Sequence, residues 1–249
     1  MEPYRVTVLL DSIDAIEDIL GSAMRFSARL DAKVEALYLK SPLAVVKQAN
    51  QLSAKRNLYE DSRKARKTLK AKIEALQLDQ AISTKVVYGN IKDTLHKYVM
   101  AEKPDLLVGS KSWFRQHGNL GAEAAWLVLS GANDFAVKEK LNLGIFENLP
   151  LDQKEDIASR ILDTANKPLR YFKIRKTAAQ KTDAKEKDVV EYVFTEGSNA
   201  LESIAKYTDR VGIDVLCLSQ TGRANNWFTS DAIGQLMRKT RVPVLLFKK

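Results

Sequence analysis

Apolar runs the length of a strand alternate with amphipathic stretches the length of a helix along the whole chain. In the first half this pattern predicts strands at 5–10, 33–39, 84–88, 105–108 and 135–137, and helices at 15–30, 43–76, 91–102 and 122–130, with a loop from 109 to 121. A regular alternation of strand and helix is typical of a parallel sheet with helices on both faces.

The second half continues in the same way. It predicts strands at 141–146, 169–174, 189–194, 214–218 and 244–247, and helices at 153–165, 199–211 and 232–239. Where the first half has its long helix, the second has only the polar stretch 176–188, which contains few large apolar residues. We therefore expect a linker or short crossover at that place.

The end of the chain repeats a segment that lies upstream. Residues 105–137 and 214–247 each consist of an apolar strand, a polar loop, a short helix and a final strand, and Ser110 to Gly121 has the same spacing as Ser219 to Ser230. Such a repeat indicates a tandem duplication. We predict an α/β protein of two tandem doubly wound parallel-sheet units, with domains 1–138 and 139–249.

Composition fits a globular protein. The 249 residues are 45% hydrophobic and 29% charged, and no apolar stretch approaches the ~20 residues that cross a bilayer. The N-terminus leads directly into a strand without the pattern of a secretory signal, so we expect a cytoplasmic protein. The single cysteine, Cys217, lies in an apolar strand and is interpreted as a core residue. The two histidines, His96 and His117, have no spacing that predicts a metal site or a catalytic triad.

The net charge of +9 raises the question of a nucleic-acid or anionic-membrane partner. Much of the excess lies in residues 55–72 and 173–187. In the first stretch Leu58, Leu69 and Ile73 share one helical face, so the charges are interpreted as the solvated side of an amphipathic helix. That interpretation is favoured over nucleic-acid binding because base-stacking aromatic residues are scarce there.

Several short segments together resemble the universal stress protein family in its tandem form. They are Val8-Leu9-Leu10-Asp11-Ser12, Gly89-Asn90, Asp105-Leu106-Leu107-Val108, Ser219-Gln220-Thr221-Gly222-Arg223, Ser230-Asp231 and Val242-Pro243-Val244-Leu245-Leu246. The resemblance covers essentially the whole chain and implies flavodoxin-like units. One branch of this family binds ATP at the carboxyl ends of the strands, through Gly-x-x-Gly, a spacer and then Gly-Ser or Gly-Thr.

Both units depart from the ATP-binding pattern. In the second unit Ser219 replaces the first glycine, Gly222 retains the second, the spacer is shorter, and Ser230-Asp231 replaces the final pair. Asp231 would repel a phosphate by like charge, whereas it suits a helix N-terminus. Arg223, beside Gly222, is either a phosphate partner or a solvated loop residue.

In the first unit the corresponding positions are Ser110, Trp113 and Gly121-Ala122, so an indole stands where the loop should approach phosphate. Asp11 occupies the family's carboxylate position at the end of the first strand, and a ligand contact and a helix cap are equally open for it. Glu147 is its counterpart in the second unit. The pairs Trp113-Phe114 and Trp227-Phe228 are interpreted as packing residues rather than adenine platforms.

No catalytic constellation, metal spacing or intact phosphate loop is present in the sequence. We therefore expect no enzymatic activity, and a regulator or scaffold that acts through protein partners or self-association, with nucleotide binding weak or lost. The alternative is an ATP-binding sensor, with or without slow hydrolysis, that uses the loop from Ser219 to Ser230. A regulatory partner of a membrane transporter or of nucleic acid is a third hypothesis, suggested by the basic charge alone.

Overall fold

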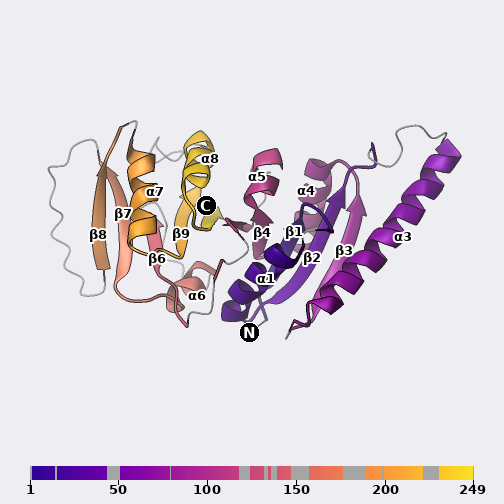
Figure 1. The fold of residues 1–249 in the computed structure, drawn as a ribbon, viewed down its shortest axis with the longest axis horizontal. Coiled ribbons are helices and arrows are strands. Elements are labelled where there is room, and N and C mark those ends of the chain that lie inside the picture. The colour runs from indigo at the N-terminus through magenta and orange to yellow at the C-terminus, as the bar shows by residue number, and fades with distance from the viewer. Residues whose placement is uncertain are drawn as a thin grey trace. The chain divides into compact units, whose positions relative to one another are not determined.

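The structure is a computed structural model that describes residues 2–14, 16–43, 51–78, 80–117, 124–131, 134–135, 139–146, 157–175, 189–197, 199–220 and 230–248. Its contacts divide the chain into two compact units, of which the first comprises Met1–Ala124 with Gly131–Asn133. The second comprises Ala125–Ser130 with Asp134–Lys249. Figure 1 shows the helices and strands of both units with their labels.

The first unit is a four-stranded parallel sheet with helices between successive strands. Its elements are β1 (Arg5–Leu10), α1 (Ile16–Ser27) with a 3-10 turn η1 (Ala28–Leu30), β2 (Lys33–Lys40), α3 (Gln51–Ala75), β3 (Ile82–Tyr88), α4 (Ile91–Glu102), β4 (Leu106–Ser110) and α5 (Lys111–His117). The strand order is β3-β2-β1-β4, and Val8 of β1 lies beside Ala36 of β2 and Val108 of β4.

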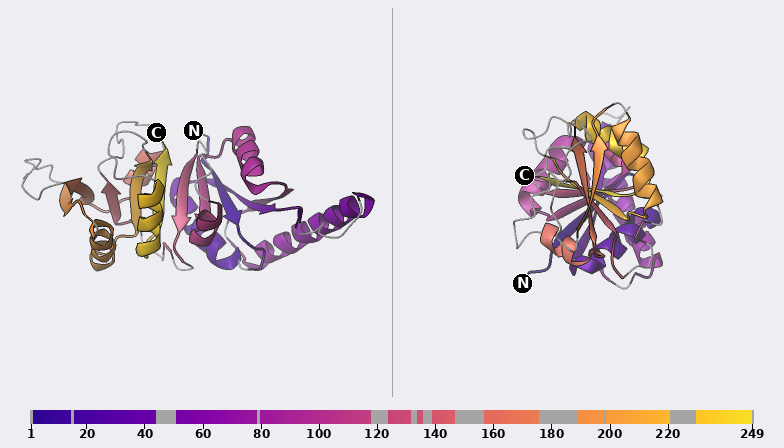
Figure 2. Two further views of the ribbon diagram at one scale, coloured as in Figure 1. Left: turned by 90° about the horizontal axis from the view of Figure 1, so that it is seen from above. Right: turned by 90° about the vertical axis from the view of Figure 1, so that its left-hand side faces the viewer.

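Helices cover both faces of this sheet. Lys85 and Tyr88 are an odd number of residues apart on β3, and successive side chains of a strand alternate between its faces. Their side chains therefore point to opposite faces. Lys85 Nζ lies 2.5 Å from Glu102 Oε1 of α4, whereas the Tyr88 hydroxyl donates to Asp61 Oδ2 of α3. The two helices therefore lie on opposite faces, which is the doubly wound arrangement expected from the sequence. Figures 1 and 2 show α3 as the long violet helix on the β3 side of the unit.

A polar network crosses the face that α4 covers. The Tyr98 hydroxyl donates to Glu35 Oε2 of β2 and lies 2.9 Å from Thr7 Oγ1 of β1. Burial and the Glu35 carboxylate raise the pKa of Tyr98, so the phenol remains a donor at neutral pH. This network satisfies polar groups that would otherwise be costly to bury between the helix and the strands.

The second unit has six strands in the order β5-β10-β9-β6-β7-β8, all parallel except β5, which is antiparallel to β10. Its elements are β5 (Ala125–Leu129), β6 (Leu143–Phe146), α6 (Ile157–Asp163), β7 (Leu169–Arg175), β8 (Val189–Thr195), α7 (Ala200–Arg210), β9 (Val215–Gln220), α8 (Ser230–Lys239) and β10 (Val244–Lys248). Phe172 anchors its core, with rings of Phe146, Tyr192, Phe194 and Tyr207 at centroid distances of 5.6, 6.0, 5.6 and 5.8 Å.

The structure corrects the elements predicted for residues 109–137. The helix expected at 122–130 is wrong, because Ala125–Leu129 form strand β5, and the loop expected at 109–121 contains helix α5. All five β5 residues are buried, and a short continuous apolar run has no periodicity that distinguishes a strand from a buried helix. Phe135, expected in a strand, lies in a turn with φ of 61°, and the linker expected at 176–188 lies outside the described residues.

Strand β5 belongs by chain order to the first half but pairs within the second unit. Leu127 lies beside Leu245, and Trp126 beside Leu246. The contacts thus assign 125–130 to the second unit, ahead of the boundary drawn from the sequence. The division into domains 1–138 and 139–249 stays a prediction about which segments fold independently.

The pairing of β5 with β10 predicts how fragments of the chain behave. A fragment of residues 139–249 lacks β5 and leaves the edge of β10 and its apolar neighbours uncovered. We expect its free energy of unfolding to be lower than that of a fragment of residues 124–249 by about several kcal/mol, because five buried apolar side chains are lost. Its unfolding midpoint should therefore lie at a lower urea concentration. Urea unfolding followed by circular dichroism measures the difference. Equal midpoints would show that β5 contributes nothing to the second unit.

Candidate functional site

The carboxyl ends of β1 and β4 bring together two residues that the sequence analysis singled out separately. These strands are parallel neighbours, so the residues that follow them meet at one edge of the sheet. Asp11 follows β1, and Ser110 is the last residue of β4. The Ser110 hydroxyl donates to Asp11 Oδ2.

Ser112, which the sequence analysis did not name as a site residue, joins this pair. Its hydroxyl also donates to Asp11 Oδ2, and the oxygens of Ser110 and Ser112 are 2.7 Å apart. Each hydroxyl has a single hydrogen to donate, so two hydrogens are shared among three contacts. The hydrogen bonds of the cluster can therefore change as the hydroxyls rotate. The only hint in the sequence was the Ser-Lys-Ser segment after the strand.

Ser110 also explains why α5 forms where a loop was expected. Its Oγ accepts a hydrogen bond from the backbone N–H of Trp113 at 2.9 Å, which is the contact that a helix-capping serine makes. The Trp113 side chain is only 2% exposed, so the helix is held down by a large buried ring. This burial agrees with the interpretation of Trp113 as a packing residue.

His117, at the last turn of α5, lies in the electrostatic field of the cluster. Its ring packs against Trp113 with centroids 4.8 Å apart. Burial lowers the pKa of His117, the Asp11 carboxylate acts to raise it, and Lys92 of α4 acts to lower it further. The edge therefore holds a carboxylate, two hydroxyls, an imidazole and an ammonium. Sequence analysis gave His117 no role, because Asp11 is far from it in the chain.

Lys92 is positioned by the turn that follows β3. Asn90 caps α4 by accepting hydrogen bonds from the backbone N–H groups of Lys92 and Asp93, at 3.0 and 3.3 Å. Gly89 has no room for a side chain, since a Cβ there would lie 2.2 Å from Thr94 Oγ1. The Gly89-Asn90 segment that carried part of the family resemblance is thus a helix-start motif.

In the second unit the structure describes only part of the predicted site. Ser219 is fully buried within β9, beside Phe247 of β10, whereas the sequence analysis placed it in the loop after the strand. Ser230 is the first residue of α8. Gly121, Gly222 and Arg223 lie outside the described residues, as do Trp227 and Glu147.

The described part of the chain offers neither a metal cluster nor a reactive thiol. No cluster of three or more His, Cys, Asp or Glu side chains gathers there in a way that could hold a metal ion. Burial raises the pKa of the Cys217 thiol to about 12, so the thiolate nucleophile is scarce at neutral pH. No helix of the described residues is long and apolar enough to cross a membrane.

Comparison with solved structures identifies the fold. No family model and no curated protein matches the sequence. A universal stress protein from Archaeoglobus fulgidus matches all of this chain over 97% of its own, with a TM-score of 0.69 and 11% identity. A putative universal stress protein from Pseudomonas aeruginosa matches 99% of this chain and 93% of its own, at a TM-score of 0.54 and 10% identity.

A functionally unknown protein, also from Pseudomonas aeruginosa, matches 98% of this chain and 92% of its own at a TM-score of 0.50 and 10% identity. At these identities the likeness establishes the fold. The chain therefore has the fold of universal stress proteins over its whole length, which confirms the architecture that the sequence resemblance implied.

The electrostatic interaction between Asp11 and His117 predicts a pKa change in a defined direction. Replacing Asp11 by Asn removes the carboxylate that favours the charged imidazole, so the pKa of His117 should fall further below its ordinary value. The proton shifts of the imidazole ring, followed by NMR against pH, measure it, with His96 as an internal reference. Asp14→Asn is the matched control and should leave His117 unchanged. An unchanged or raised pKa in Asp11→Asn would contradict the geometry.

The lowered pKa of His117 also makes the stability of the fold depend on pH in a defined direction. The unfolded chain binds the imidazole proton more readily than the folded chain, so His117 stabilises the fold above its ordinary pKa of 6.5. That contribution declines as the pH falls through 6.5 toward the folded pKa. Urea unfolding at a series of pH values should therefore show a smaller loss toward acid in His117→Gln than in the parent chain; an equal loss would exclude this contribution.

Proposed function

We propose that the chain is a cytoplasmic universal stress protein of the tandem form, acting as a non-catalytic regulator or scaffold with weak or lost nucleotide binding. One observation carries the proposal, namely that Ser110 and Ser112 donate their hydroxyl hydrogens to Asp11. This cluster stands at the carboxyl edge of the first unit, where ATP-binding members of the fold would place the start of a phosphate loop.

The electrostatics of the cluster oppose a nucleotide phosphate. Phosphate sites on such sheets need converging backbone N–H groups or cations, which supply positive potential. Here the exposed Asp11 carboxylate repels an anion, and hydroxyls that could donate to phosphate oxygens are engaged with that carboxylate. Lys92 acts on His117 from the neighbouring helix, and its ammonium offsets part of the repulsion from Asp11.

The conformation of the segment after β4 supports the same conclusion. A phosphate cradle needs a glycine-rich backbone that approaches its ligand closely. Residues 111–117 instead form a helix, capped by Ser110 and anchored by the buried Trp113. The first unit is thus built around side-chain packing at the place where the ligand would lie. A regulator with this construction would act through contacts with partner proteins or through self-association.

The second unit supports the alternative function, an ATP-binding sensor with or without slow hydrolysis. Strand β9 ends at Gln220 and helix α8 begins at Ser230, and a strand followed by a helix is the order found in nucleotide sites of this fold. The segment between them contains Gly222 and Arg223, which suit close backbone approach and phosphate pairing. This candidate therefore depends on the second unit alone.

Titration with ATP and magnesium tests both functions in the intact chain. We expect isothermal titration calorimetry to find no saturation below about 1 mM ATP, which corresponds to only about 4 kcal/mol of binding free energy. A dissociation constant in the low micromolar range would contradict the proposal. If such binding is abolished by Gly222→Trp and retained in Asp11→Asn, the sensor function of the second unit takes its place.

A further inference from the structure

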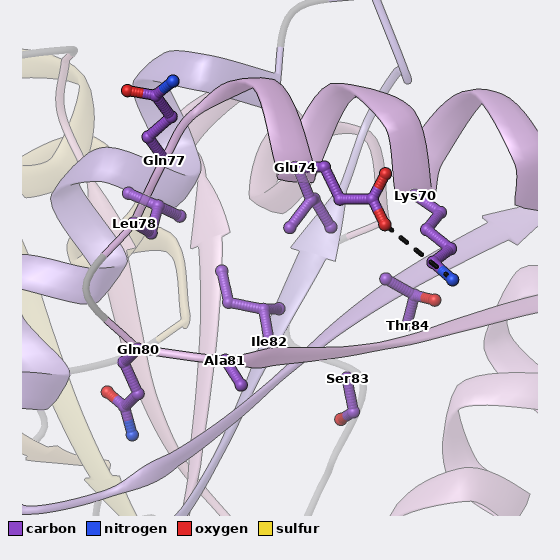
Figure 3. Close-up of a pocket in the computed structure, with 10 residues that line it drawn as sticks. Lys70, Glu74, Gln77, Leu78, Gln80, Ala81, Ile82, Ser83 and Thr84 are labelled. Atoms are coloured by element: carbon purple, nitrogen blue, oxygen red, sulfur yellow. Dashed lines mark ion pairs between the residues drawn. The ribbon is translucent and has the colours of Figure 1, made fainter.

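A groove between α3 and β3 of the first unit lies away from the Asp11 cluster. Two adjoining cavities of about 520 and 420 Å³ form it, and they share the residues Lys70 and Thr84. The first is lined by the end of α3, the following turn and the start of β3, and the second by Arg66, Lys67, Lys70, Thr84, Lys85 and Val86. Figure 3 shows the first cavity, with Ile82 and Thr84 pointing from β3 toward the helix.

Beside this groove runs an open strand edge. In the first unit β3 pairs with β2 on one side, and it is the outermost strand in the described part of the chain. An edge strand directs the backbone N–H and C=O groups of alternate residues away from its neighbour, where another strand can bind them. Residues 82–86 of β3 line the two cavities. At the rise of a strand these five residues span about 16 Å. This length suits an extended segment of about five residues.

The helix side of the groove is strongly cationic. Helix α3 has eight basic and three acidic residues, so it contributes +5 to the net charge of +9. Its acidic residues already have partners: Glu60 lies 2.8 Å from Arg56, Asp61 lies 2.8 Å from Lys40, and Glu74 lies 3.8 Å from Lys70. Arg66 and Lys67 are exposed, and no acidic side chain of the described residues lies within ion-pair distance of them. An anionic partner would meet cations that are not already neutralised.

The other end of the groove carries apolar side chains among polar ones such as Glu74 and Gln77. Ile73, Leu78 and Ile82 line the first cavity, and each is only half-buried. A partner that fills this end removes their remaining apolar surface from water. The groove thus combines an end with apolar side chains, a cationic end and a strand edge that runs along both.

We propose that this groove binds an extended acidic segment of a partner protein, which adds as a strand beside β3. Its carboxylates pair with Arg66 and Lys67, its backbone pairs with the edge of β3, and an apolar side chain occupies the end at Ile73 and Ile82. A nucleic acid would neutralise the cations but would leave the edge of β3 unpaired, and no aromatic side chain lines either cavity for base stacking. The proposal deepens the regulator function above, because it specifies the chemistry of the partner.

Fluorescence anisotropy on the intact chain tests the proposal with a defined probe. The probe is a labelled ten-residue peptide of alternating glutamate and valine, and the controls are a lysine–valine peptide and a glutamate–valine peptide N-methylated at alternate backbone positions. We expect the probe to bind at least tenfold more tightly than either control at low salt. Equal binding of the N-methylated peptide would overturn strand addition, and tighter binding of a single-stranded oligonucleotide would identify the groove as a nucleic-acid surface.

Charge-reversal variants locate the binding. Arg66→Glu with Lys67→Glu changes two exposed residues of the groove, and Lys55→Glu with Arg63→Glu makes the same change of charge on the same helix outside it. The first pair should weaken probe binding at least tenfold and the second less than twofold. An equal loss in both would indicate unspecific attraction to the basic helix and overturn the proposal.

Amide hydrogen exchange gives a readout that needs no variant. The probe should slow exchange at residues 82–86 at least tenfold, because strand addition bonds their outward N–H groups. No slowing at saturating probe would overturn the proposal. The peptide and ATP titrations report on different parts of the chain, so failure of this inference and failure of the proposed loss of nucleotide binding are distinguishable.

Discussion

The parallel pairing of β1 with β4 determines what the candidate site contains. Nearly all residues of both strands are buried, and their register places the ends of the two strands side by side. Asp11 and Ser110 are brought into hydrogen-bonding contact because Asp11 follows β1 and Ser110 ends β4, although they are far apart in the chain. Burial of apolar strand residues supplies the free energy that holds the polar cluster at the edge.

The same strand end controls the segment that follows it. Ser110 donates to Asp11 and accepts from the backbone of Trp113, so one hydroxyl connects the end of β4 to the first turn of α5. Since Trp113 is buried, α5 and the cluster stabilise each other. A phosphate loop and this capped helix are competing uses of one short segment, and the side chains present here favour the helix.

The first unit separates two kinds of surface. Its carboxyl edge carries Asp11, hydroxyls and a histidine whose burial lowers its pKa, whereas α3 concentrates positive charge beside the open edge of β3. Asp61 links the helix to the sheet, through the Tyr88 hydroxyl and Lys40. Its pKa is lowered overall, because these hydrogen bonds and the charges of Lys40 and Lys64 outweigh its burial. The contact holds α3 against β3, so the cationic residues have a defined position.

Local pattern was enough to predict most of the fold from the sequence. Residues 5–10 and 91–102 form the predicted strand and helix with the same bounds. Leu69, from the predicted apolar face of α3, is fully buried, because a helical period of apolar residues favours burial on one side. The position of Asp11 at the end of the first strand followed from the same pattern, whereas the fold of universal stress proteins was implied by the resemblance of short segments to that family.

The remaining features depend on tertiary contacts that no local pattern encodes. Ala125–Leu129 form a strand, where a helix was expected, because their backbone finds a partner in β10, more than a hundred residues away. Ser112 and His117 join the candidate site only because the sheet brings β1 beside β4. The sequence by itself determined which segments are strands or helices wherever periodicity was clear. Tertiary structure decided whether a short apolar run forms a strand or a helix, and which residues make up the site. Both depend on which distant backbone and side-chain groups satisfy their hydrogen bonds.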